Sequence, residues 1–153
     1  MGDMTFCQFN LESCRLYKED DGLYHRLAKH FGLSDSAFWI VYTLEAARRS
    51  LTQAEMSGYL NLSKQTINSG IKSLEQAGYI RPTGGPGRKK YLELTQAGQA
   101  LAERTARPVL NMEQRAFQAM SPTERAALLT LTRRHLELRL REAEQIFQQP
   151  QEE

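Results

Sequence analysis

The chain has 153 residues, which is the length of one domain with a substantial core. Hydrophobic residues (41%) and charged residues (25%) exclude a wholly disordered chain, and two cysteines exclude a disulfide scaffold, while a net charge of +2 leaves a nucleic-acid partner open. We find no apolar run of membrane-spanning length and no secretion signal at the N-terminus, so we expect a cytoplasmic protein without a membrane partner.

The first predicted element is a long amphipathic helix over residues 5–31. Aromatic and aliphatic residues recur at helical spacing from Phe6 to Phe31, and Gly32 supplies a typical helix end. We expect residues 20–22 to interrupt the helix, because Gly22 weakens a helix interior.

Residues 34–95 are predicted to form a winged helix-turn-helix. Ser34 or Asp35 can cap a first helix, a short helix follows the cap Thr52, and a third helix, capped by Ser63, ends at Gly78. Two short helices joined by a tight turn are typical of a helix-turn-helix. The alternating residues that follow, broken by a glycine-rich turn over 83–87, indicate a β-hairpin, or wing.

The C-terminal region, residues 96–147, is predicted to be helical. Thr95 caps its first helix, Pro108 must kink or break it, and Ser121 with Pro122 restarts a helix that reaches about Phe147. Residues 148–153 are expected to be a frayed tail. The fold class is therefore mainly α with a small hairpin.

The apolar stripes of the two ends, residues 5–31 and 96–147, are too wide for one small core. We therefore expect these ends to be dimerisation helices of a symmetric homodimer.

Basic charge is concentrated between residues 61 and 92. This stretch carries six Lys or Arg residues and one Glu, a net charge of +5, so the rest of the chain carries −3. The helix that starts at Ser63 and the wing are the elements that meet DNA in a winged helix-turn-helix, so we favour double-stranded DNA over an ordinary solvated surface.

Helical geometry divides the helix after Ser63 into two faces. Ile67, Ile71 and Leu74 share the inward face. Asn and Gln side chains can pair with adenine edges, and Lys can reach guanine or phosphate. The outward residues expected to contact DNA are Lys64, Gln65, Asn68, Ser69 and Lys72. An ordinary surface role stays open, above all for Ser69.

Further contacts are expected beside this helix and on the wing. The amides next to the caps Thr52 and Ser63 could hold phosphates. Arg88 follows the small glycine-rich tip and is the best candidate for a minor groove, while Lys89 and Lys90 would hold backbone phosphates.

Four segments of the chain form a characteristic combination: residues 51–55, 62–67, 74–81 and 94–98. Together they resemble the MarR family (multiple-antibiotic-resistance regulators). The resemblance implies a homodimeric bacterial transcription regulator on a pseudo-palindromic operator, usually a repressor released by a small ligand or oxidant. It implies a recognition helix over residues 63–75, which adds Thr66 to the DNA-binding set, and it places Arg88 at the wing arginine.

The chain departs from the family pattern at two positions. Pro86 stands where an acidic residue usually orients the wing arginine, and Ser69 stands where an arginine is frequent. Both departures indicate an altered or weaker sequence preference.

Effector sensing has two candidate sites. Tyr24, Trp39 and Tyr42 lie on elements that would line a pocket in such a regulator, although each also suits plain core. Cys7 and Cys14 would be about 10.5 Å apart along a helix, too far for a disulfide within it but not for one between protomers. We favour inert cysteines, since buried cysteine is commonly packing.

We expect no enzyme, no cofactor and no metal site. His25, His30 and His135 are scattered among helices without metal-ligand spacing, and we find no nucleophile motif. Two alternatives to a ligand-controlled DNA regulator stay open: a winged helix that binds a protein partner, and a cysteine redox sensor.

Overall fold

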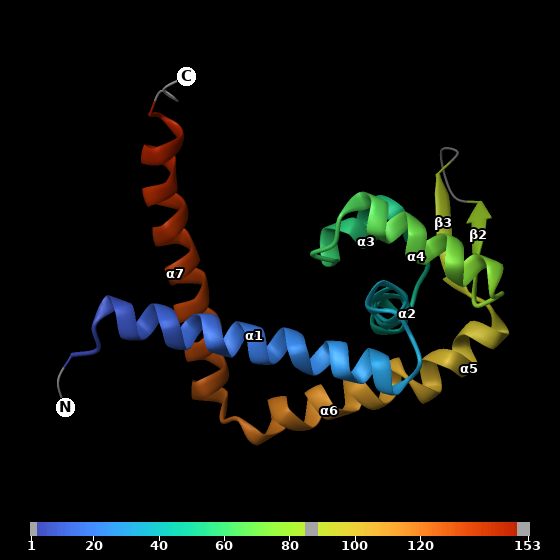
Figure 1. The fold of residues 1–153 in the computed structure, drawn as a ribbon. Coiled ribbons are helices and arrows are strands. Elements are labelled where there is room, and N and C mark those ends of the chain that lie inside the picture. Colours follow the sequence, from blue (N-terminus) through green and yellow to red (C-terminus); the bar gives the residue numbers. More distant parts are fainter. Residues whose placement is uncertain (1–2, 85–88, 150–153) are drawn as a thin grey trace. The chain divides into compact units, whose positions relative to one another are not determined.

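The computed structural model describes residues 3–84 and 89–149, which form seven helices and three short strands (Figure 1). The chain divides into two compact units, Met1–Leu110 and Asn111–Glu153, and the boundary falls inside α6. The prediction of a mainly α fold with a small wing is confirmed. In chain order the elements are α1 (Phe6–His30), α2 (Asp35–Ala47), β1 (Leu51–Thr52), α3 (Gln53–Tyr59), α4 (Lys64–Gln76), β2 (Ile80–Gly84), β3 (Lys90–Leu94), α5 (Gln96–Arg104), α6 (Ala106–Ala119) and α7 (Pro122–Phe147).

Hydroxyl side chains begin six of the seven helices in the described part of the chain. Each accepts a hydrogen bond from a backbone N–H in the first turn, which satisfies a donor that the helix itself cannot pair. The caps are Thr5, Ser34, Thr52, Ser63, Thr95 and Ser121. The predicted caps Thr52, Ser63, Thr95 and Ser121 are confirmed, and of the two candidates Ser34 and Asp35 the structure has Ser34. Gly32 and Gly78 follow α1 and α4 with positive φ, which glycine adopts without strain.

Helix α2 lies at the centre of the first unit. Its side chains Ile40, Val41 and Leu44 are buried against α4, α5 and the sheet. A Cβ at Gly70 of α4 would lie 2.7 Å from Cδ1 of Ile40, so the glycine lets α4 approach α2 closely. The close neighbours of Gly70 belong to α2 and not to α3, the helix that directly precedes α4 in the chain.

The wing is part of a three-stranded antiparallel sheet in the order β1-β3-β2. Ile80 pairs with Leu94 and Gly84 with Lys90, so the predicted hairpin is confirmed. β1 was not predicted as a strand. It has only two residues, and its pairing with β3 joins positions about forty residues apart in the chain, which local patterning does not reveal.

The base of the wing is closed by a tight approach of α5. The Thr95 hydroxyl donates to the Gly78 carbonyl at 2.6 Å, and the Thr95 N–H donates to the Tyr79 carbonyl at 3.0 Å. A Cβ at Gly98 would lie 1.8 Å from that Tyr79 oxygen. Only glycine therefore fits at position 98, in the first turn of α5.

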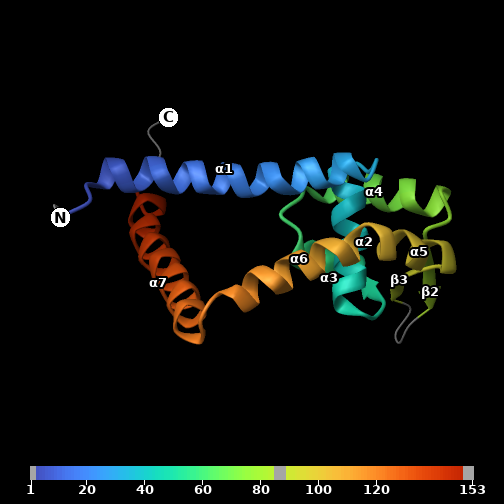
Figure 2. The same ribbon diagram turned by 90° about the horizontal axis from the view of Figure 1, so that it is seen from below.

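Helix α1 is continuous over 25 residues, so the predicted interruption at residues 20–22 is wrong. One glycine costs a helix interior about 1 kcal/mol, which its long helical flanks tolerate. Figure 2 shows that only the C-terminal end of α1 reaches α2. Accordingly, Ala28 is its one buried residue among those described.

The helix break expected at Pro108 occurs three residues earlier. Thr105 separates α5 from α6, and its hydroxyl donates to the Leu101 carbonyl at 2.7 Å. Pro108 then lies in the first turn of α6, where a missing N–H costs nothing. Arg107 ties this start of α6 to α2 through Glu45, at 2.8 Å.

The second unit contains the end of α6 and all of α7. The Arg125 guanidinium lies 3.9 Å from the centre of the Phe117 ring and donates to the Phe117 carbonyl at 2.8 Å. No described residue of α7 is buried, although the helix carries many leucines. No helix in the described ranges is both long enough and apolar enough to cross a membrane.

Candidate nucleic-acid interface

Helix α4 has an apolar inner face and a polar outer face, as predicted. Ile67, Ile71 and Leu74 are buried. The positions expected to contact DNA are all exposed: Lys64, Gln65, Thr66, Asn68, Ser69 and Lys72. The structure therefore brings these six residues onto the solvent-facing side of one helix.

Two contacts pre-arrange polar groups at the start of this face. The Gln53 side-chain amide of α3 donates to the Asn68 Oδ1 atom, and this link between the two helices was missed from the sequence. The hydroxyls of Ser63 and Thr66 share a hydrogen bond at 2.7 Å. Asn68 and Thr66 are thus held in place by neighbours before any ligand binds.

The start of α3 is held by a capping box with an added ion pair. Glu55 accepts from the Thr52 N–H at 2.7 Å and from Arg49 at 2.9 Å. These contacts, the Thr52 N–H first, lower the pKa of Glu55 to about 2. The same pair raises the pKa of Arg49. Thr52 therefore has a structural task, and its hydroxyl is engaged within the chain.

The wing carries exposed cations near the same end of the unit. Figures 1 and 2 both show α4 and the β2–β3 hairpin at the end of the first unit that lies away from the N-terminus of α1. Lys89 and Lys90 are exposed. Arg88, the candidate for a minor groove, lies outside the described residues. Across the hairpin, Arg81 pairs with Glu93 at 2.6 Å.

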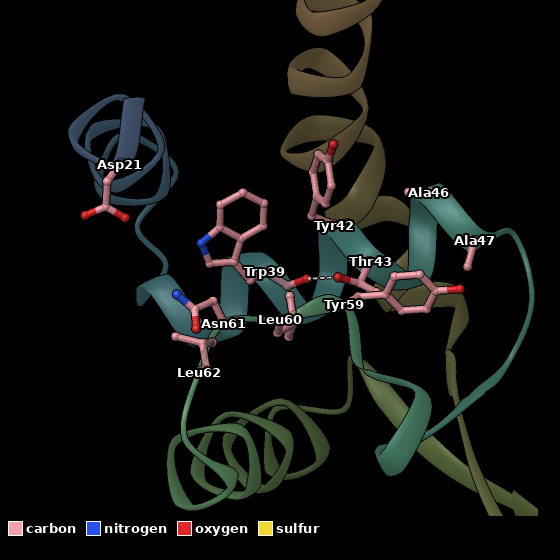
Figure 3. A pocket seen from close by; sticks show the side chains of 10 residues that line it. All are labelled: Asp21, Trp39, Tyr42, Thr43, Ala46, Ala47, Tyr59, Leu60, Asn61 and Leu62. Carbon is pink, nitrogen blue, oxygen red and sulfur yellow. Dashed lines mark hydrogen bonds between the residues drawn. The ribbon is translucent and has the colours of Figure 1, made fainter. Parts of the chain in front are cut away.

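A pocket of about 600 Å³ lies behind the helix-turn-helix (Figure 3). One side of α2 between Trp39 and Ala47, the segment 59–62 and Asp21 of α1 line it. Of the three predicted effector residues, Trp39 and Tyr42 line the pocket. Tyr24 instead packs against Trp39, with ring centres 4.8 Å apart.

The sequence reading missed the contribution of segment 59–62 and of Asp21 to this pocket. Both come from elements that only the tertiary fold brings beside α2. The sequence shows Tyr59 only as an aromatic residue of a short predicted helix, and its exposure is known from the structure.

The two cysteines are exposed on α1, so the argument that they are inert because they are buried is wrong. Their side chains point to solvent from a helix that covers little of its own unit. Within residues 3–84 and 89–149, no three His, Cys, Asp or Glu side chains are grouped closely enough to hold a metal ion.

Comparison with known proteins gives a family match to one segment and a fold for the chain. Residues 31–89 match the family model described as the MarR family. No curated protein sequence matches the chain. NMB1585, a MarR family regulator from Neisseria meningitidis, shares 22% identity at a TM-score of 0.74, with 93% of this chain and 99% of that chain covered.

Two further solved structures share the fold. The Staphylococcus aureus MepR–DNA complex has 19% identity and a TM-score of 0.63, with 87% of this chain and 95% of that chain covered. Bordetella bronchiseptica BpsR, whose DNA binding is regulated by 6-hydroxynicotinic acid, has 20% identity and a TM-score of 0.61, covering 88% and 99%. The winged-helix segment of the chain therefore resembles the MarR family, and the chain shares the fold of solved MarR family regulators.

Proposed function

We propose that the protein is a homodimeric, sequence-specific repressor that dissociates from DNA when it binds a small ligand. The observation that carries this proposal is the exposed polar face of α4, which is flanked by the basic wing. A helix of this kind, capped at its start and backed by apolar packing, fits a major groove.

The residues of the interface have separate roles in this proposal. Lys64 and Lys72 of α4, with Lys89 and Lys90 of the wing, neutralise phosphates and supply affinity on any sequence. Gln65 and Asn68 read base edges, and the Gln53 amide holds Asn68 in position for that task. Thr66 and Ser69 complete the face of α4 toward the groove.

The helix starts and the wing tip add further contacts. Backbone N–H groups beside the caps Thr52 and Ser63 point toward phosphates, since the hydroxyls themselves are engaged in capping. Arg88 enters the adjacent minor groove.

A second copy of the chain covers the apolar faces of α1 and α7. Both helices expose large hydrophobic side chains, among them Phe6, Leu16, Leu129 and Leu136. Monomeric proteins rarely leave such extended apolar stripes in water. A two-fold dimer presents two copies of α4 to half-sites about one DNA turn apart, and thus prefers a pseudo-palindromic operator.

The proposed release mechanism acts on the spacing of the two lobes. A ligand in the pocket behind α3 and α4 changes how far apart the two recognition helices lie, and so whether both fit the operator. The BpsR structure gives a fold relative in which a small molecule regulates DNA binding.

The proposal is tested by DNA binding across a salt series, with the upstream region of its own gene against unrelated DNA. We expect preference for the upstream fragment and a steep loss of affinity as salt rises. Lys72→Ala should weaken binding to both fragments and reduce the salt slope by about one. Lys18→Ala, an exposed lysine on α1, is the matched control and should change neither.

Asn68→Ala tests base reading separately. We expect it to reduce the preference for the upstream fragment by roughly five- to 100-fold, with the salt slope unchanged. If Asn68→Ala and Lys72→Ala gave the same pattern, the division between base reading and phosphate binding would be wrong.

A redox sensor is the second candidate, because Cys7 and Cys14 are exposed. Peroxide treatment followed by non-reducing electrophoresis would show a cross-linked dimer that Cys7→Ser abolishes.

A wing that binds a protein partner predicts instead that the protein binds no DNA even at low salt.

A further inference from the structure

The pocket behind the helix-turn-helix has an unusual charge and ring content. Asp21 is the one ionisable acid in its lining, and no Lys, Arg or His contributes to it within the described residues. Asp21 is exposed, and its carboxylate would repel an anionic ligand, which would find no cation in the described lining to pair with.

Aromatic rings supply the rest of the recognition surface. Trp39, Tyr42 and Tyr59 come from α2 and the end of α3, and Figure 3 shows them around the cavity with Asp21 on the α1 side. The Trp39 and Tyr42 ring centres lie 5.2 Å apart at an interplanar angle of 78°, so the two rings present surfaces of different orientation to the same cavity. The faces of such rings attract cations, and Trp does so most strongly.

From this arrangement we propose that the pocket binds an organic cation, an amine or quaternary ammonium group that carries an apolar body. The charged group lies between Asp21 and the aromatic rings, and the apolar body fills the space beside Ala46 and Ala47. A volume of about 600 Å³ is enough for a molecule of drug size. This inference deepens the proposed function and rests on it for the link to DNA release.

The pocket wall also connects the ligand to the recognition helix. Segment 59–62 ends α3 and leads directly to Ser63, whose hydroxyl caps α4. A cation drawn toward Asp21 therefore contacts the connector that sets where α4 begins. The opposite wall is α2, against which Gly70 of α4 packs closely. Occupancy thus shifts α4 relative to α2 and changes the fit to DNA.

The test uses Trp39 as the reporter, since it is the one tryptophan in the chain. The probes are phenyltrimethylammonium, its uncharged isostere tert-butylbenzene, and benzoate. We expect phenyltrimethylammonium to change Trp39 emission saturably and benzoate to bind most weakly.

Charge recognition is isolated by one substitution and its neighbour. Asp21→Asn should weaken phenyltrimethylammonium by about five- to tenfold and leave tert-butylbenzene unchanged. Asp20→Asn, the adjacent exposed carboxylate that does not line the pocket, is the matched control and should change neither. Circular dichroism of both variants checks that the fold is kept.

The outcomes separate this inference from the proposed function. No saturable change in Trp39 emission, tighter binding of benzoate, or an unchanged phenyltrimethylammonium affinity in Asp21→Asn would each overturn the cation site. Saturable binding that leaves operator affinity unchanged would overturn the coupling to α4. If the protein bound no DNA under any condition, the proposed function would fail, while the Trp39 titrations would still decide the cation site.

Discussion

Helices α4 and α7 both carry large apolar side chains, but these are buried on α4 and exposed on α7. On α4, Ile67 is 0% exposed and Ile71 is 8% exposed, because α2 lies against them. On α7, Leu129 is 69% exposed and Leu136 is 51% exposed. Apolar residues at helical spacing therefore predict that a helix has an apolar face, but they do not show whether the same chain or another chain buries that face.

This difference separates a self-sufficient lobe from helices that need a partner. The lobe around α2 buries its core apolar side chains against one another. A hydrogen bond from Thr95, the cap of α5, holds the base of its wing. Helices α1 and α7 leave their stripes in water, and in the proposed dimer a second copy covers them.

The largest effect is expected from charges on the apolar face of α7. The double substitution Leu129→Asp with Leu136→Asp acts twice in a symmetric dimer, and we expect the dimer dissociation constant to rise by about 1000-fold. Sedimentation measures the change, and operator binding should fall with it. Both side chains are exposed within one chain, so the variant protein should still fold.

The control for this variant is Thr130→Asp, which adds one such charge about 100° around the helix from Leu129. It should remain a dimer. A double variant that also stayed dimeric would show that this face of α7 is not the dimer interface.

A smaller effect is expected inside the lobe at Gly98. An alanine Cβ would collide with the Tyr79 carbonyl oxygen, which is backbone and cannot move aside cheaply. We expect Gly98→Ala to lower the free energy of unfolding by about 2 kcal/mol. Gly58→Ala, in α3 with no atom within 4 Å of the new Cβ, should instead be neutral or stabilise by about 0.5 kcal/mol.

Urea denaturation followed by circular dichroism compares these two glycine variants. If Gly98→Ala matched Gly58→Ala in stability, the close approach of α5 to the wing would not contribute to the lobe. Dimerisation of the Gly98→Ala variant at low temperature should be retained, since α1 and α7 are untouched.

The smallest effect compares the same capping motif in the two regions. Glu55 begins α3 and Glu124 begins α7, and both accept a hydrogen bond from the backbone N–H of their cap, which lowers the pKa of each. Glu55 also pairs with Arg49, and its pKa falls to about 2. A lowered folded-state pKa gives stability that is present above the unfolded value of about 4.5 and is lost as pH falls toward 2.

We therefore expect Glu55→Gln to flatten the loss of stability between about pH 4.5 and 2, and Glu124→Gln to do so less. Thermal unfolding at a series of pH values measures both slopes. Equal slopes in the two variants would mean that Arg49 adds nothing to the cap of α3.

Much of the lobe could be predicted from local sequence. Some features depend only on a residue and its near neighbours, so they can be predicted from the sequence. They include helix caps such as Thr52 and Ser63, the glycines that end helices, and the alternation in β3. The outward face of α4 follows equally from helical periodicity once Ile67 and Ile71 are assigned to the core.

Tertiary structure decided the features that join distant segments. β1 exists because residues 51–52 meet residues 91–92, Gly70 is needed because Ile40 lies opposite, and Gln53 reaches Asn68 across the turn. The pocket is the fullest example, because Asp21, Trp39 and Tyr59 come from three helices. Such contacts depend on how folded elements approach one another, and a single sequence carries no local signal of that approach.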